Sequence, residues 1–189
     1  MNIGLYFGSF NPIHIGHLII ANHVLSNAHL QKIWFVVSPH NPLKNEKSLL
    51  NEYDRIHMVD LAISDNTDFK SSNVEFNLPK PSYTIHTLTY LVEKFPNDQF
   101  TIIMGGDSFQ NIKNWKNYEQ LLTQFPIIVY ERPGFKIDTS LGNITVLKAP
   151  LLDISSTHVR REIKKGNSIK YLVPDSVASY IENNNYYHS

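Results

Sequence analysis

The chain has 189 residues, a length typical of one domain, and its 17 Lys and Arg residues balance 17 Asp and Glu residues. This balance excludes a global charge that would attract nucleic acid or an anionic membrane surface, so neither is expected as a partner. The sequence has no cysteine, which excludes disulfides, thiolate catalysis and cysteine-bound zinc. Because it also shows no signal-peptide run and no membrane-spanning run, we expect a cytoplasmic protein.

The first part of the chain predicts a parallel strand–helix–strand unit. Residues 3–7 form an apolar run typical of a buried strand, 18–25 carry the pattern of an amphipathic helix, and 33–37 predict a second strand. A loop over 38–50 follows at the carboxyl end of that strand, where open parallel sheets bind ligands. Asn51 then suits the N-cap of another helix.

The rest of the chain continues this alternation. The expected strands are 74–76, which is weak, 100–107, 127–130 and 144–147. The expected helices are 85–95, 117–125, one that opens within 154–160 and ends before Gly166, and a closing one with Pro174 in its first turn. The tail over 183–189 is expected to be frayed or lightly docked. The pattern predicts a Rossmann-like, doubly wound α/β fold with a mostly parallel sheet. We expect one domain over 1–189, helical over about 155–185.

The turn between the first strand and the first helix, residues 8–17, has the sequence GSFNPIHIGH. Gly8 permits a sharp turn, and Gly16 removes a side chain where the helix opens. Free N–H groups and the positive end of the helix dipole favour an anion at that point. His14 and His17, three positions apart, lie on the same side of the opening. This turn is therefore predicted to handle a phosphate.

A second helix start, residues 154–160, has the sequence ISSTHVR and a similar character. Ser155 or Ser156 is the expected N-cap, and Arg160 lies four positions after Ser156 on the same helical face. Hydroxyls, free N–H groups and a forked guanidinium all suit phosphate oxygens. Two such helix starts in one chain predict a polyphosphate clamp.

The two motifs resemble the HxGH and ISSTxxR signatures of the nucleotidyltransferase α/β-phosphodiesterase superfamily. The form over 11–14 is similar to its nicotinate-nucleotide adenylyltransferase branch. The resemblance implies adenylyl transfer from ATP to nicotinate mononucleotide in NAD biosynthesis, giving nicotinate adenine dinucleotide and pyrophosphate. Mg²⁺, held mainly by the ATP phosphates, is the implied cofactor. A phosphate with a second pKa near ~6 is largely ionised at neutral pH, so its attack needs positioning rather than a general base.

The resemblance also implies roles for single residues in catalysis and in ATP binding. His14 and His17 would donate to the α-phosphate oxygens, and Arg160, together with Mg²⁺, would stabilise the leaving pyrophosphate. The residues implied in ATP binding are Gly8, Ser9, Phe10, Gly16, Ser155, Ser156 and Thr157.

For the mononucleotide, the resemblance implies that Trp115 stacks on the pyridine ring. Backbone N–H groups near Thr84 and Trp115 would receive the nicotinate carboxylate, and Asp107 would hold ribose hydroxyls or a metal-bound water. The full implied set is Asn11, Lys44, Tyr83, Thr84, Gly105, Asp107 and Trp115.

Two positions depart from the family pattern. Bacterial members often have His where this chain has Leu43, and usually have Asp where it has His86. The first departure leaves Lys44 as the candidate for one phosphate contact. The second changes the charge at a helix start, because a carboxylate favours a helix N-terminus and a histidine does not.

Other functions fit these residues less well. Pantetheine-phosphate adenylyltransferases typically carry Thr where His14 stands, and cytidylyltransferases carry Asp where Asn11 stands. A non-catalytic nucleotide-binding or sensing protein is the alternative from another class. The lack of a Walker lysine motif and of GxGxxG disfavours a P-loop ATPase and a Rossmann dehydrogenase. The sequence leaves open the preference between acid and amide mononucleotides, and whether the chain forms a homo-oligomer.

Overall fold

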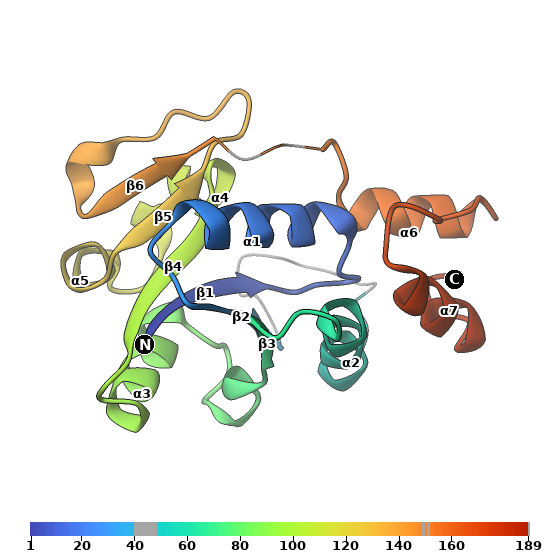
Figure 1. Ribbon diagram of the computed structural model, residues 1–189, viewed down its shortest axis with the longest axis horizontal. Helices are drawn as coiled ribbons and strands as arrows, with labels where there is room; N and C mark the ends of the chain where they lie inside the picture. Colours follow the sequence, from blue (N-terminus) through green and yellow to red (C-terminus); the bar gives the residue numbers. More distant parts are fainter. Residues whose placement is uncertain (40–48, 149, 151, 189) are drawn as a thin grey trace.

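The computed structural model describes residues 1–39, 49–148, 150 and 152–188. Within them, six parallel strands form one sheet in the order β3-β2-β1-β4-β5-β6 (Figure 1). The strands are β1 (Asn2–Gly8), β2 (Lys32–Val37), β3 (Phe69–Ser72), β4 (Gln99–Gly105), β5 (Ile127–Tyr130) and β6 (Ile144–Leu147). The chain builds outward from β1 on one side and then places β4 on the other, so the strand order reverses between β1 and β4. The predicted doubly wound α/β fold is confirmed.

Helices cover both faces of this sheet. They are α1 (Ile15–Asn27), α2 (Glu52–Ile63), α3 (Thr84–Lys94), α4 (Gly106–Gln110), α5 (Tyr118–Gln124), α6 (Ser156–Lys164) and α7 (Asp175–Asn183). Tyr6 of β1 packs in the apolar cluster with α1, α2, α6 and α7, whereas its neighbour Leu5 packs in the cluster with α3, α4 and α5. Because both faces are buried, β1, β2 and β5 are nearly continuous apolar runs. None of the helices in the described ranges has the length and apolar character needed to cross a bilayer.

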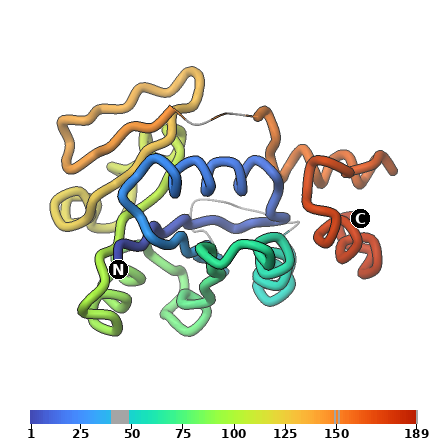
Figure 2. The backbone as a smooth tube through the Cα atoms, in the orientation of Figure 1, coloured from blue at the N-terminus to red at the C-terminus, as the bar shows by residue number. Residues whose placement is uncertain are grey.

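The C-terminal helices lie beside the start of α1, although they are far from it in sequence (Figure 2). The Ile15 N–H donates to the Leu172 carbonyl at 2.9 Å. Ser155 caps α6, its side chain accepting from the His158 N–H at 3.1 Å, and Gly166 follows α6 with a φ of +72°. These observations confirm the predicted second helix start and its predicted glycine end.

One predicted strand is wrong. Val74–Asn77 form a short 3₁₀ helix, and the third strand of the sheet is Phe69–Ser72. That strand lies at the sheet edge and carries a single large apolar residue, Phe69, so its sequence gives little strand signal. The apolar residues of 74–76 instead flank a buried carboxylate, Glu75.

The described part of the C-terminal tail, residues 183–188, is docked rather than frayed. Tyr187 is 7% exposed, and its hydroxyl donates to Oδ1 of Asn11 at 2.8 Å. Pro174 immediately precedes α7, so it occupies the cap position and not the first turn. The tail therefore packs against the turn that follows β1.

Candidate active site

The turn over 8–17 follows β1 where the strand order reverses. Phe10 is its buried anchor, with ring centroids 5.9 Å from Tyr6 and 5.1 Å from His17. Phe10 has a φ of +46°, which is uncommon for a large side chain. A methyl group on Gly8 would lie 2.8 Å from the Phe10 ring. Glycine at this position therefore makes room for that ring. The φ angle of Gly8 is not positive, so the expected conformational freedom for a sharp turn is not what requires glycine here.

His14 and His17 stack against each other within this turn. Their ring centroids are 3.7 Å apart and their planes meet at 27°. The His14 N–H donates to Nδ1 of His17 at 3.2 Å, so a neutral His17 ring carries its proton on Nε2. A methyl group on Gly16 would lie 3.1 Å from the His14 ring, which explains the glycine where the helix opens. The predicted convergence of the two imidazoles is confirmed.

The His14 ring is uncharged at neutral pH. It is 5% exposed, and burial, followed by the charge of Arg132, lowers its pKa to about 4. Its Nδ1 is buried and has no hydrogen-bond partner within the described residues. His14 can therefore donate a hydrogen bond as a neutral imidazole, but it brings no positive charge to the site.

The two predicted phosphate turns lie against each other. The Ser156 hydroxyl donates to the Pro12 carbonyl at 2.8 Å. One Nη of Arg160 donates to the Asn11 carbonyl at 2.7 Å, and the other donates to the Thr157 hydroxyl at 3.3 Å. The fold thus brings the starts of α1 and α6 together from opposite ends of the chain (Figure 1).

Asn11 joins this arrangement to two further segments. It is 1% exposed, and its Oδ1 accepts from the Leu50 N–H at 3.3 Å as well as from the Tyr187 hydroxyl at 2.8 Å. The carboxamide oxygen therefore faces the protein and braces the first turn against the chain entering α2 and against the tail. The implied role of Asn11 in mononucleotide binding stays a prediction.

A pocket of about 400 Å³ opens beside the first turn, at the carboxyl ends of β1, β2 and β4. Among the residues that the structure describes, its walls contain six of the predicted site residues, namely Gly8, Ser9, Tyr83, Thr84, Gly105 and Trp115. His14, His17 and Arg160 are not part of its walls. Tyr6 connects the two regions, because it lines the pocket and its ring centroid lies 6.1 Å from that of His17.

One end of the pocket is aromatic and cationic. Lys116 lines it, with Nζ 4.5 Å from the centroid of the Tyr83 ring, and the half-buried Trp115 stands next to it. The backbone N–H of Trp115 donates to the Ile112 carbonyl at 2.9 Å, so in this conformation that backbone N–H is not available to a ligand carboxylate. Thr84 is the first residue of α3, and its N–H has no acceptor inside the helix. Lys116 could not be predicted as a site residue from the sequence, because a single lysine forms no recognisable motif.

Glu75 lines the same pocket and is a second residue that sequence reasoning missed. It is 2% exposed and accepts a hydrogen bond from the Thr87 hydroxyl at 2.8 Å. Burial raises the pKa of Glu75, while hydroxyls of Ser82, Thr87 and Ser38 act in the opposite direction. No local pattern distinguishes a glutamate that will be buried from one that will be solvated.

The remaining candidates have varied surroundings. Asp107 lies in the first turn of α4 and forms an ion pair with Arg132, with 3.5 Å between Oδ1 and Nε and both side chains 41% exposed. Such a pair contributes little to stability and leaves the carboxylate accessible. His86 is exposed near the start of α3. Lys44 and Leu43 lie outside the described residues.

Comparison with known proteins identifies the family of the chain. Residues 5–162 match the model of the cytidylyltransferase-like family. The chain is 49% identical to the "Probable nicotinate-nucleotide adenylyltransferase" of Flavobacterium psychrophilum over 99% of each chain. It is 47% identical to the protein of the same name from Cytophaga hutchinsonii, over 99% of this chain and 98% of the relative.

A solved structure agrees with the sequence relatives. The fold matches Plasmodium falciparum nicotinic acid mononucleotide adenylyltransferase complexed with NaAD, with a TM-score of 0.83 and 25% sequence identity. The match covers 98% of this chain and 97% of that one. Identity along the full length and a shared fold lead to one conclusion: the chain belongs to the nicotinate-nucleotide adenylyltransferase family.

Proposed function

We propose that this chain transfers the adenylyl group of ATP to the phosphate of nicotinate mononucleotide, releasing pyrophosphate and forming nicotinate adenine dinucleotide for NAD biosynthesis. The observation that carries the proposal is the meeting of two helix starts, α1 and α6, beside a pocket with aromatic and cationic walls. Helix starts of this kind suit anions. Relatives named for this activity support the proposal. Because ATP is a substrate, the proposal includes a cytoplasmic location.

The histidine pair and Arg160 act on the phosphates in this proposal. Nε2 of His17 and the neutral His14 ring donate hydrogen bonds to the α-phosphate oxygens, where charge shifts during in-line transfer. Arg160 and the start of α6 stabilise the leaving pyrophosphate. The ionised phosphate of the mononucleotide is itself the nucleophile, so no side chain has to remove a proton.

Magnesium fits the site as a companion of ATP. Within the described residues, no group of three or more His, Asp or Glu side chains is placed to hold a metal ion. A polyphosphate supplies the oxygen ligands that Mg²⁺ prefers, and Mg²⁺ bound in this way supplies charge neutralisation at the leaving group. The half-exposed Asp107 would hold a metal-bound water or the ribose hydroxyls.

The aromatic end of the pocket binds the pyridine ring in this proposal. Trp115 and Tyr83 offer ring faces for stacking. Lys116 supplies a cation, and the Thr84 N–H points out of a helix start, which together suit a carboxylate. These groups favour nicotinate over nicotinamide mononucleotide.

The test supplies Mg-ATP with nicotinate mononucleotide, nicotinamide mononucleotide or phosphopantetheine, and Mg-CTP with the first of these. We expect pyrophosphate and nicotinate adenine dinucleotide from the nicotinate reaction, at the highest kcat/KM of the four. Turnover only with phosphopantetheine or CTP would assign a different transferase. ATP binding by calorimetry without pyrophosphate from any acceptor would assign a nucleotide sensor.

A further inference from the structure

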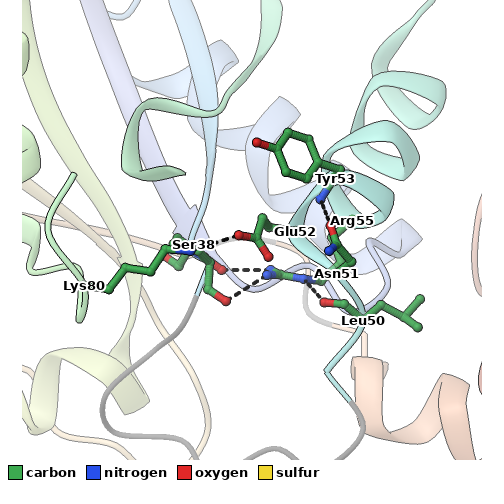
Figure 3. A network of polar contacts seen from close by, with 8 residues as sticks. Ser38, Leu50, Asn51, Glu52, Tyr53, Arg55 and Lys80 are labelled. Carbon is green, nitrogen blue, oxygen red and sulfur yellow. Dashed lines mark hydrogen bonds and ion pairs between the residues drawn. The ribbon is translucent and has the colours of Figure 1, made fainter. Parts of the chain in front are cut away.

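Arg55 lies in the first turn of α2 with its side chain completely buried. Its Nε donates to the Leu50 carbonyl at 2.9 Å, and one Nη donates to the carbonyls of Ser9 at 2.6 Å and Ser38 at 2.8 Å. The other Nη donates to the Pro39 carbonyl at 3.0 Å. Figure 3 shows the Arg55 side chain with Ser38 and Leu50, two of the residues whose carbonyls it contacts. One side chain therefore contacts the turn after β1, the end of β2 and the chain that enters α2.

The chemistry of this contact requires arginine. A buried charge is tolerated when its donors are hydrogen-bonded, and carbonyl oxygens meet that need here. The guanidinium is planar and its donors form a rigid fork, so the carbonyls that it binds are held at defined relative positions. A lysine ammonium is a point charge on a flexible chain and cannot reproduce this geometry. Because Ser9 and Ser38 line the pocket, Arg55 defines the spacing of two of its walls.

The bond to the Ser9 carbonyl also sets the direction of the next amide. In a planar trans peptide the C=O and N–H bonds point to opposite sides, so the Phe10 N–H points away from Arg55. This N–H donates no hydrogen bond within the described residues, and Phe10 has a φ of +46°. A backbone donor is thus held ready at the start of the phosphate turn.

We infer that Arg55 is a positioning residue for adenylyl transfer, holding the Ser9–Phe10 peptide and the end of β2 so that the first turn presents its donors to a phosphate before substrate binds. The inference rests on the proposed function. Donors that are already oriented act most strongly in the transition state, because they need no reorganisation as the charge moves. The loss of Arg55 should therefore lower kcat more than it raises KM.

The test compares Arg55→Lys with Val59→Ala, measuring pyrophosphate release from Mg-ATP and nicotinate mononucleotide. Arg55→Lys keeps the charge and removes the fork, and we expect kcat to fall about 10- to 100-fold with little change in KM. Val59 is completely buried one turn further along α2, so its truncation weakens the packing of that helix without touching the four carbonyls. Its kcat should stay close to that of the wild type.

Chemical rescue gives a readout that a purely structural role would not move. Millimolar guanidinium added to Arg55→Ala should restore part of kcat, because the ion can occupy the vacated site, and it should not raise kcat of Val59→Ala. If the Arg55 variants do not fold, the test uses the wild type instead, in which the NMR signal of the Phe10 backbone amide is followed in ¹⁵N-Phe-labelled protein. That signal should shift when Mg-ATP is added.

The outcomes separate the inference from the function on which it rests. An active wild type together with an Arg55→Lys kcat equal to that of Val59→Ala would overturn the inference alone. An unchanged Phe10 amide signal on ATP binding would do the same. A wild type that releases no pyrophosphate would remove both the proposed function and the inference.

Discussion

The two ends of the site are built differently. The proposed phosphate end is cross-braced, and its first turn, residues 8–17, is largely buried, with Asn11 1% exposed and His14 5% exposed. Its second turn, residues 154–160, packs against the first but is half-buried or exposed apart from Val159. The proposed pyridine end, formed by Tyr83, Thr84, Trp115 and Lys116, has half-buried or exposed side chains. Transfer chemistry needs donors in defined positions, whereas recognition of a ring and a carboxylate tolerates adjustable side chains. Changes at the two ends should therefore alter different kinetic constants.

The largest effect is expected from His17→Ala. Loss of a donor aimed at the α-phosphate should lower kcat on the order of 100-fold or more, with a much smaller change in KM for ATP. The measurement is steady-state pyrophosphate release. His23→Ala, on the same helix and outside the site, is the matched control and should keep the wild-type kcat. An unchanged kcat in His17→Ala would remove this residue from catalysis.

The buried His14 predicts a loss of stability in acid. Its pKa of about 4 lies below the ordinary value of 6.5, so as the pH falls the unfolded chain takes up the proton first. The free energy of unfolding should therefore drop between pH 6.5 and 4 by up to about 3 kcal/mol. Above pH 6.5 the contribution of His14 to that free energy should not depend on pH. Urea unfolding at several pH values measures the drop. His14→Asn should show a flatter profile, and an identical slope in both proteins would contradict the burial of a neutral imidazole.

Lys116→Met should alter the choice between substrates. Removing the cation should lower kcat/KM for nicotinate mononucleotide about tenfold, the size of a hydrogen bond to a charged group. The value for nicotinamide mononucleotide should change little, because that ligand has no carboxylate. Lys113→Met makes the same charge change nearby without touching the pocket, and should leave the ratio unaltered. Equal losses for both mononucleotides would show that Lys116 does not face the carboxylate.

The smallest effect is expected from Glu75→Gln. Burial raises the folded-state pKa above the ordinary 4.5, so the ionised carboxylate destabilises the fold as the pH rises through that raised value. A neutral amide can still accept the bond from Thr87. The variant should melt a few degrees higher than the wild type at neutral pH, with the difference shrinking in acid. A variant that is less stable at neutral pH would contradict this reasoning.

Much of the fold could be predicted from the sequence, because both faces of the sheet are buried and its central strands are mostly apolar. The failure at 74–76 has a physical reason, since an edge strand such as Phe69–Ser72 needs few apolar residues and is stabilised by pairing with β2. The sequence left open whether the tail is frayed or lightly docked. Its docking depends on Tyr187 meeting Asn11 across the whole chain.

The candidate site was predictable where its chemistry is local. His14, His17, Ser155 and Arg160 stand in short motifs at helix starts, and the structure brings the two motifs together. Arg55 and two charged residues that line the pocket, Glu75 and Lys116, were not predictable. Their importance comes from burial or from a neighbouring ring, and both are tertiary properties.

The most direct test of the central claim asks whether both turns contact the same ATP. Side-chain signals of His17 and Arg160 can be followed by NMR in ¹⁵N-His- and ¹⁵N-Arg-labelled protein during titration with a non-hydrolysable ATP analogue and Mg²⁺, with variants providing the assignments. We expect both signals to shift with one common dissociation constant. A response from only one of them would show that the two turns do not share a triphosphate, and would contradict the proposed mechanism.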